Sequence, residues 1–108
     1  KNSAIAEGTI INGGGDVVIG ENVLISTYVT INANEHKMAK NDIIKNQGYI
    51  HKPVIIEDDC LIGAKVSINK NVTIKKGSII GVGSVVTKDT KEYKIYAGVP
   101  VKEIGERR

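Results

Sequence analysis

The sequence predicts an all-β fold, a parallel β-helix forming one domain over residues 1–108. The aliphatic residues are mostly β-branched, with 18 Ile and 12 Val against two Leu and no Phe or Trp, and such residues favour strands. Aliphatic residues also recur every six positions over long stretches. A six-residue period suits short strands separated by bends, with three strands to a coil, and suits neither an amphipathic helix nor a hairpin meander.

The repeat has two informative positions. Its first position is aliphatic in nine hexads: Ile19, Ile25, Ile31, Ile56, Ile62, Ile68, Ile74, Ile80 and Val86. Its fifth position is small or medium-sized: Val23, Val29, Cys60, Val66, Val72, Ser78 and Ser84. We therefore expect the first residue of each hexad to fill the interior and the fifth to fill a narrow corner. Residues 56–91 then form two coils, and residues 19–36 form one.

The N-terminal stretch has a shifted register. Ile5, Ile11 and Val17 keep the six-residue spacing but lie two residues out of phase with Ile19. Glycine tolerates positive φ, so the segment "NGGGD" (12–16) is interpreted as a turn or bulge that absorbs the slip.

The period is lost between His36 and Pro53. We expect residues 37–53, approximately, to leave the coil as a protruding loop, and the residues after the last hexads to form a short C-terminal segment. Long loops in compact domains are usually functional or disordered. Two residues of this region, Met38 and Tyr49, are candidates either for packing against a neighbouring subunit or for lining a cleft. His36 stands where the chain departs, which makes it the leading candidate for chemistry.

Composition narrows the function classes. A length of 108 residues allows one core and excludes a second catalytic domain. The net charge of +3 comes from lysines spread along the chain. A nucleic-acid binder would cluster such charges with aromatic residues, whereas a mild basic excess suits a small anionic ligand.

The single cysteine, Cys60, cannot form an internal disulfide, and no Cys/His spacing typical of a metal site is present. We therefore expect no metal and a reducing, cytoplasmic location. No apolar run reaches membrane-spanning length, and no signal peptide begins the chain. The first residue is Lys1 rather than Met, as in a fragment of a longer protein.

Three segments carry a family resemblance: "KPVIIEDDCLIGA" (52–64), "GVGSVVTKD" (81–89) and "AGVPVKEI" (97–104). They resemble the hexapeptide-repeat acyltransferases, which have a left-handed β-helix, so the handedness is implied by this resemblance alone. The frame "VVIGENVLISTYVTINANEH" ahead of a loop is most similar to the O-acetyltransferases of sugars and bacterial surface polysaccharides.

The resemblance implies a site. His36, sixteen residues after Gly20, is the expected general base. An imidazole titrates near neutral pH, so it can take the proton of a saccharide hydroxyl as the oxygen attacks the thioester of acetyl-CoA. It then protonates the leaving thiolate, with no acyl-enzyme. Glu35 and Asp42 are candidates for holding its other ring nitrogen. The implied cofactor contacts are Ala64, Val82, Thr87, Lys88 and Lys102, with Arg107 and Arg108 able to reach the nucleotide end.

The chain departs from these relatives at three positions. Leu61 replaces a frequent Trp, Gly14 an acceptor-binding Asp, and Ala6 an Asn, so the sugar contacts of the maltose and galactoside enzymes are not carried over. The "GGGD" segment is closer to the polysaccharide-modifying branch. Family members are trimers with active sites between subunits, and a homotrimer is therefore expected here.

Other interpretations stay open. His36 can be a solvated loop histidine, Lys88 a solvated turn lysine, and His51 a bystander or at most an acceptor contact. Cys60 is expected to pack inward rather than to act as a nucleophile. Rival functions are serine or amino-sugar acetylation on the same fold, and a non-catalytic structural or binding solenoid. A β-helix carbonic anhydrase needs three zinc-binding histidines per site, and the chain has two His.

Overall fold

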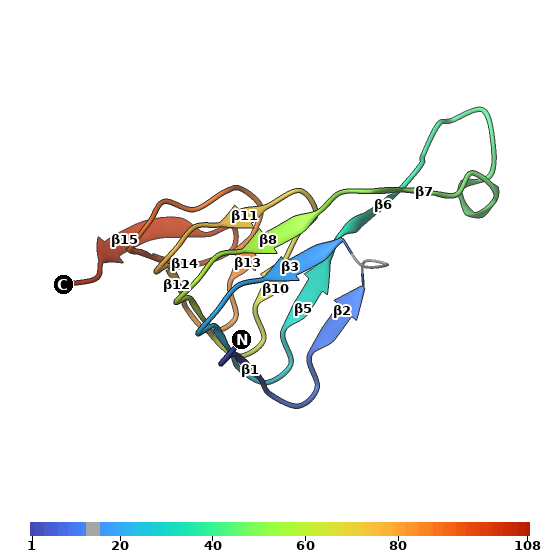
Figure 1. The fold of residues 1–108 in the computed structure, drawn as a ribbon. Helices are drawn as coiled ribbons and strands as arrows, with labels where there is room; N and C mark the ends of the chain where they lie inside the picture. The colour runs from blue at the N-terminus through green and yellow to red at the C-terminus, as the bar shows by residue number, and fades with distance from the viewer. Residues whose placement is uncertain (13–15) are drawn as a thin grey trace.

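The computed structural model describes residues 1–12 and 16–108. Short strands wrap around a three-sided interior, and equivalent strands of successive coils lie side by side in parallel sheets, here named A, B and C (Figure 1). Sheet A contains β1 (Ala4–Ile5), β4 (Leu24–Ile25), β9 (Leu61–Ile62), β12 (Ile79–Ile80), β14 (Lys94–Ala97) and β15 (Lys102–Glu106). Sheet B contains β2 (Ile10–Asn12), β5 (Thr30–Asn32), β10 (Ser67–Ile68) and β13 (Val85–Val86). Sheet C contains β3 (Val17–Ile19), β8 (Val54–Ile56) and β11 (Thr73–Ile74).

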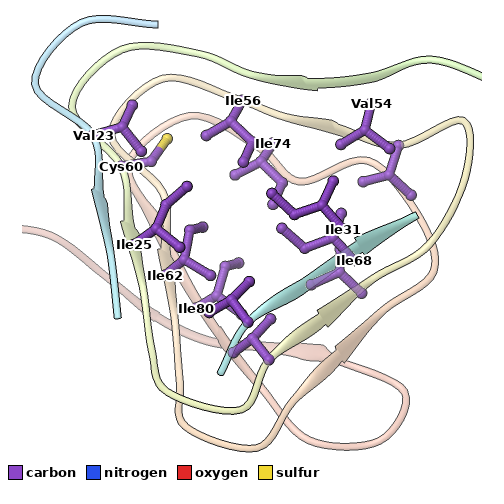
Figure 2. Close-up of a cluster of buried hydrophobic side chains, with 14 of the residues drawn as sticks. Val23, Ile25, Ile31, Val54, Ile56, Cys60, Ile62, Ile68, Ile74 and Ile80 are labelled. Carbon is purple, nitrogen blue, oxygen red and sulfur yellow. The ribbon is translucent and has the colours of Figure 1, made fainter. Parts of the chain in front are cut away.

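The pairing register confirms coils of three hexads. Ile56 pairs with Ile74, Ile62 with Ile80 and Ile68 with Val86, so partners lie 18 residues apart in each sheet. These first-position side chains are at most 1% exposed and line the three walls of the interior (Figure 2). The aliphatic repeat is therefore the core of the protein.

The N-terminal coil is offset as the sequence predicts, but its register differs in one detail. Ile5 pairs with Ile25 and Ile11 with Ile31, which places both isoleucines at first positions. Val17 instead pairs with Val54, and Ile19 pairs with Ile56. Ile19, rather than Val17, therefore occupies the first hexad position that follows Ile11. The turn expected at residues 12–16 includes residues 13–15, which lie outside the described residues.

The fifth positions of the hexads form the corners. All seven side chains predicted there are buried, with at most 2% exposure. The polar ones are satisfied: Ser78 Oγ donates to the Lys75 carbonyl at 2.6 Å, and Ser84 Oγ accepts from the Gly98 amide at 3.1 Å. The Cys60 thiol donates to the same Lys75 carbonyl, and burial raises the pKa of this thiol. Cys60 packs as a small interior residue, as expected.

The fourth position of the hexads adopts the left-handed backbone conformation, which the sequence analysis did not anticipate. Asn22, Asp59, Lys65 and Asn71 have φ between 58° and 60°. Such a conformation is costly for residues other than Gly, and least so for Asn and Asp. The corner turns offset this cost by stacking: the Asp59 amide donates to the Glu21 carbonyl and the Lys65 amide to the Thr27 carbonyl, each in the preceding coil.

An antiparallel hairpin projects from the coil stack (Figure 1). Its strands are β6 (Asn34–His36) and β7 (Tyr49–His51), and its distal part contains the 3-10 helix η1 (Ile44–Asn46). Gln47 orders the tip, since its amide nitrogen donates to the carbonyls of Ala39 and Asp42. The protruding segment is confirmed, but it leaves the coil after the buried Ala33 rather than after His36. His36 is consequently part of the hairpin and not of the coil.

The C-terminal segment forms a second antiparallel pair, β14 and β15, at the edge of sheet A. The Lys94 ammonium donates to Glu106 Oε2 at 2.8 Å, and this contact raises the pKa of Lys94 and lowers the pKa of Glu106. The connection between the strands docks on β13, where Val101 donates to the Val85 carbonyl. No helix in the described part of the chain is long and apolar enough to cross a membrane.

Replacing a first-position isoleucine should strongly destabilise the coil. Ile68 is 1% exposed and sits between Ile31 and Val86 in sheet B. We expect Ile68→Ala to lower the free energy of unfolding by about 2–5 kcal/mol, because methylene burial is lost and a cavity is left. Ser67→Ala, at the adjacent outward position, should change it by less than about 0.5 kcal/mol. Urea unfolding at one fixed protein concentration measures both, and equal effects would contradict the inward assignment.

Candidate functional site

The base predicted from the sequence, His36, lies on the hairpin and is exposed. Neighbouring residues of a strand point to opposite faces, so His36 shares one face of the hairpin with Asn34, and Glu35 occupies the other. Across the ladder, His36 is opposite Tyr49 and Asn34 is opposite His51. On either side of these pairs lies a backbone hydrogen bond. The Lys37 amide donates to the Gly48 carbonyl, and the Lys52 amide donates to the Ala33 carbonyl. Both pairs are therefore of the non-hydrogen-bonded kind, in which side chains lie closest.

His36 opens into a polar pocket at the base of the hairpin. The pocket has a volume of about 200 Å³ and is lined by Asn12, Asn32, Asn34, His36 and Tyr49. The Tyr49 ring stands edge-on to the His36 ring, with the centroids 6.1 Å apart. Three asparagine side chains supply both donors and acceptors, as a polyhydroxylated ligand requires. The pocket joins the end of sheet B to the hairpin.

Neither candidate partner of His36 is positioned to orient its ring. Glu35 faces away and lies 3.6 Å from the Lys70 ammonium, measured from Oε1 to Nζ. Asp42 is near the hairpin tip, where its Oδ1 accepts from the Ile43 amide at 2.7 Å. In residues 1–12 and 16–108, the His36 ring has Tyr49 as an aromatic neighbour and makes no hydrogen bond.

A histidine that the sequence analysis set aside is held more firmly. His51 Nδ1 lies 2.9 Å from Asn34 Oδ1 and 3.1 Å from Asp16 Oδ2. The Tyr49 ring contacts the His51 ring edge-on, with the centroids 5.6 Å apart. The sequence contains a signal for this shared face of the hairpin. In "NEH" (34–36) and "YIH" (49–51), on either side of the loop, the first and third residues of each strand point to the same side. Asp16 has no comparable signal.

The five predicted cofactor residues fall into two groups. Ala64, Val82 and Lys102 lie near the corner between sheets A and B, where the Gly83 amide donates to the Ala64 carbonyl at 2.9 Å. Val82 is 74% exposed there. Thr87 and Lys88 lie at the other end of β13, directly after its last residue. The outer face of β13 therefore runs from the first group of residues to the second.

Thr87 opens into a second pocket, on the other side of the hairpin from the pocket of His36. This pocket has a volume of about 450 Å³ and is lined by Glu35, Lys52, Asn69, Lys70, Asn71 and Thr87. His36 and Thr87 therefore line different pockets within one chain. The structure of the chain thus keeps the predicted base apart from Thr87, one of the predicted cofactor residues.

Arg107 is engaged within the chain. Its Nη1 lies 3.0 Å from Asp59 Oδ2, and its guanidinium lies 5.7 Å from the centroid of the Tyr93 ring. These contacts tie β15 to the corner between sheets C and A. They account for Arg107 without a bound nucleotide. Arg108 is exposed beside it, at the end of β15.

The departures from the sugar enzymes occupy different places. Leu61 is 40% exposed on the outer face of sheet A, where it pairs with Leu24 and Ile79 in an apolar ladder. It does not line the pocket of His36. Ala6 follows β1 and donates its amide to the Ile25 carbonyl. Gly14 lies outside the described residues. Among the residues that the structure describes, no group of three or more His, Cys, Asp or Glu side chains is placed to hold a metal ion.

The repeat has known relatives. Residues 53–88 match the family described as bacterial transferase hexapeptide (six repeats). The chain belongs to the hexapeptide-repeat family. A galactoside O-acetyltransferase of Escherichia coli (strain K12) is 40% identical over 94 residues, which cover 84% of this chain and 46% of the relative.

Solved structures have the same fold. AntD, an N-acyltransferase from Bacillus cereus, was crystallised as a mutant in complex with dTDP-4-amino-4,6-dideoxyglucose and coenzyme A; it matches with a TM-score of 0.85 at 26% identity, covering 98% of this chain and 61% of that one. The polySia specific acetyltransferase NeuO matches with a TM-score of 0.81 at 30% identity, covering 98% of this chain and 50% of that one. The chain thus spans about half the length of these relatives.

Replacing Arg107 should affect stability and not cofactor affinity. Since its ion pair with Asp59 is largely exposed, we expect Arg107→Ala to lower the free energy of unfolding by at most about 1 kcal/mol. The Kd for coenzyme A should stay unchanged, as it should for Arg108→Ala. Urea unfolding and calorimetry measure the two effects. A rise in this Kd of about tenfold for Arg107→Ala would instead place the guanidinium at the nucleotide.

Proposed function

We propose that this chain is the β-helix domain of an acetyl-CoA-dependent O-acetyltransferase that modifies a saccharide hydroxyl, in a surface-polysaccharide unit or its precursor. The observation that carries the proposal is the placement of an exposed histidine, His36, in a pocket lined by amide and phenol side chains. Relatives named as a galactoside O-acetyltransferase and a polySia specific acetyltransferase support the acceptor class. The left-handed winding implied by the resemblance and a cytoplasmic location belong to the same proposal.

The proposed mechanism is direct transfer. The His36 imidazole accepts the proton of the acceptor hydroxyl while the hydroxyl oxygen forms a bond to the acetyl carbonyl carbon of the thioester. The carbon–sulfur bond then breaks, and the same imidazole returns its proton to the departing thiolate. The products are the acetyl ester and free coenzyme A, so no acyl-enzyme is needed. General-base assistance of this kind is worth about 10²- to 10⁴-fold in rate.

The cofactor is proposed to lie along the outside of β13. Its pantetheine arm would run past Ala64 and Val82, where small or exposed side chains leave the backbone accessible. Thr87, Lys88 and Lys102 would supply polar and positively charged contacts for its amides and phosphates. AntD, which was crystallised with coenzyme A, supports the cofactor class.

We propose a homotrimer with the active site between subunits. Two observations support it. His36 and Thr87 line separate pockets on opposite sides of the hairpin, so a complete site needs the base of one copy and the cofactor residues of another. Sheet A also exposes an apolar ladder that includes Leu24 and Leu61, 53% and 40% exposed.

A second candidate is N-acetylation of an amino sugar. The specific observation in its favour is the match to AntD, whose complex contains an amino-sugar nucleotide. An amine with a free lone pair needs less base assistance than a hydroxyl does, so the two functions differ in their dependence on His36. An acceptor screen therefore separates them.

Loss of the base should remove transfer and leave cofactor binding intact. The screen uses acetyl-CoA with thiol detection and three acceptors: methyl β-D-galactopyranoside, oligomeric sialic acid and dTDP-4-amino-4,6-dideoxyglucose. With the saccharide hydroxyls, we expect His36→Ala to lower kcat by about 10²- to 10⁴-fold. Calorimetry should give the same affinity for coenzyme A as in the unmodified protein. Lys37→Ala, at the next position of the hairpin, is the matched control and should retain turnover.

Other outcomes have definite meanings. Unchanged turnover of a saccharide by His36→Ala would contradict the base assignment. Transfer to the amino sugar alone would favour the second candidate. A protein that neither binds coenzyme A nor turns over any acceptor would be a structural or binding solenoid.

The trimer makes a separate prediction. Sedimentation equilibrium should give a mass of three chains of 11.6 kDa each, and dilution to the monomer should abolish turnover, because no single chain unites His36 with Thr87. A species of 11.6 kDa with full activity would contradict both the assembly and the shared site.

A further inference from the structure

The face of the hairpin that holds His36 carries a second imidazole. In the β6–β7 ladder, His36 is opposite Tyr49 and His51 is opposite Asn34. His36 and His51 are therefore diagonal neighbours, whose α-carbons in such a ladder are about 7–8 Å apart. The Tyr49 ring lies edge-on to both imidazoles, with centroid separations of 6.1 and 5.6 Å. The two histidines thus flank one tyrosine on one surface.

The contacts of His51 favour one tautomer of its ring. Its Nδ1 is within hydrogen-bond distance of two oxygens, Asn34 Oδ1 at 2.9 Å and Asp16 Oδ2 at 3.1 Å. Carboxylate and amide oxygens are acceptors, so both contacts favour the tautomer in which Nδ1 carries the hydrogen and donates it. In the neutral ring, Nε2 then keeps its lone pair. An acceptor carboxylate on one ring nitrogen is how proteins present the other nitrogen to a ligand.

The two histidines differ in how they are held. His36, the proposed base, has Tyr49 as its ring neighbour and no hydrogen-bonded partner among the described residues. His51 is fixed from two directions, by Asn34 on the hairpin and by Asp16 at the start of sheet C. Its side chain remains 51% exposed. A fixed orientation with a free lone pair suits binding of a hydroxyl.

We propose that His51 binds the acceptor: its Nε2 accepts a hydrogen bond from a second hydroxyl of the saccharide whose reacting hydroxyl faces His36. Asp16 is the positioning residue, since it fixes the tautomer of His51. This inference rests on the proposed function, and it assigns that site an acceptor with at least two hydroxyls on one ring.

A purely structural role for His51 is the rival explanation. Its contact with Asp16 also ties the hairpin to the preceding coil, and loss of that tie would disturb every substrate alike. The two roles differ in their response to the acceptor. A binding role raises the acceptor KM and depends on one particular hydroxyl, whereas a structural role lowers stability and kcat for all acceptors.

The experiment combines variants with deoxy acceptors. Methyl β-D-galactopyranoside and its four monodeoxy derivatives serve as probes, and KM and kcat are measured for the whole chain. We expect His51→Ala to raise the KM for the galactoside about 3- to 10-fold, the value of one hydrogen bond, with kcat and the KM for acetyl-CoA nearly unchanged. With the unmodified enzyme, one deoxy derivative should have a KM raised by the same factor relative to the galactoside. With His51→Ala, the KM for this derivative should rise no further.

Two further variants sharpen the result. His51→Gln retains an acceptor atom near the position of Nε2 and should recover part of the affinity. Ile50→Ala changes the neighbouring residue on the opposite face of β7, opposite Glu35, and should leave the KM for the galactoside unchanged. Asp16→Asn should also raise the KM for the galactoside, but by less than His51→Ala does.

The outcomes separate this inference from the proposed function. If the unmodified enzyme acetylates the galactoside and His51→Ala leaves its KM unchanged, the inference is overturned and the proposed function stands. Equal losses for all five probes, with a lower thermal midpoint, would also overturn it in favour of the structural tie. If the unmodified enzyme transfers no acetyl group to the galactoside or to any deoxy derivative while His36-dependent transfer to sialic acid persists, the inference fails for galactosides. Absence of transfer to every hydroxyl acceptor would overturn the proposed function together with the inference.

Discussion

The width of the coil interior constrains the rest of this structure. Each of the three walls contributes one isoleucine per coil, and these side chains are at most 3% exposed from Ile25 to Ile80. The buried corners hold only Val, Cys, Ser or Thr between Val23 and Thr90. Interiors are packed to the density of organic crystals, so a larger residue at a corner or a smaller one on a wall would be costly. The six-residue period follows from this geometry. One wall with its corner takes six residues, so inward residues of successive coils pair 18 residues apart.

The hairpin is inserted into this stack without disturbing it. Ile31 still pairs with Ile68 and Ile25 with Ile62, although the hairpin separates the coils that contain them. The insertion begins after Ala33 and ends before Val54, and both of these residues are fully buried. His36 and His51 are each three residues from one of these anchors. Side chains on a projecting hairpin are thus held close to the buried core of the molecule, as a precise binding site requires.

The repeat could be interpreted from the chain alone because each hexad is a local unit. The inward position, the corner position and the two-residue slip near the N-terminus were all visible in the sequence, and strand pairing and burial confirmed them. The left-handed conformation at the fourth position was not visible. Its occupants include Asn, Asp, Lys, Tyr and Gly, since the turn is stabilised by hydrogen bonds to the neighbouring coil rather than by residue type.

The sequence by itself determined the fold class and the presence of a projecting segment. It could do so because the six-residue repeat and the stretch where it is lost are both visible along a short length of chain. Only the tertiary structure decided that His36 lies on the hairpin and that Asp16 contacts His51. Asp16 and His51 are far apart in the chain and no period relates them. Their contact depends on a hairpin folding back over an earlier coil, which local spacing does not specify.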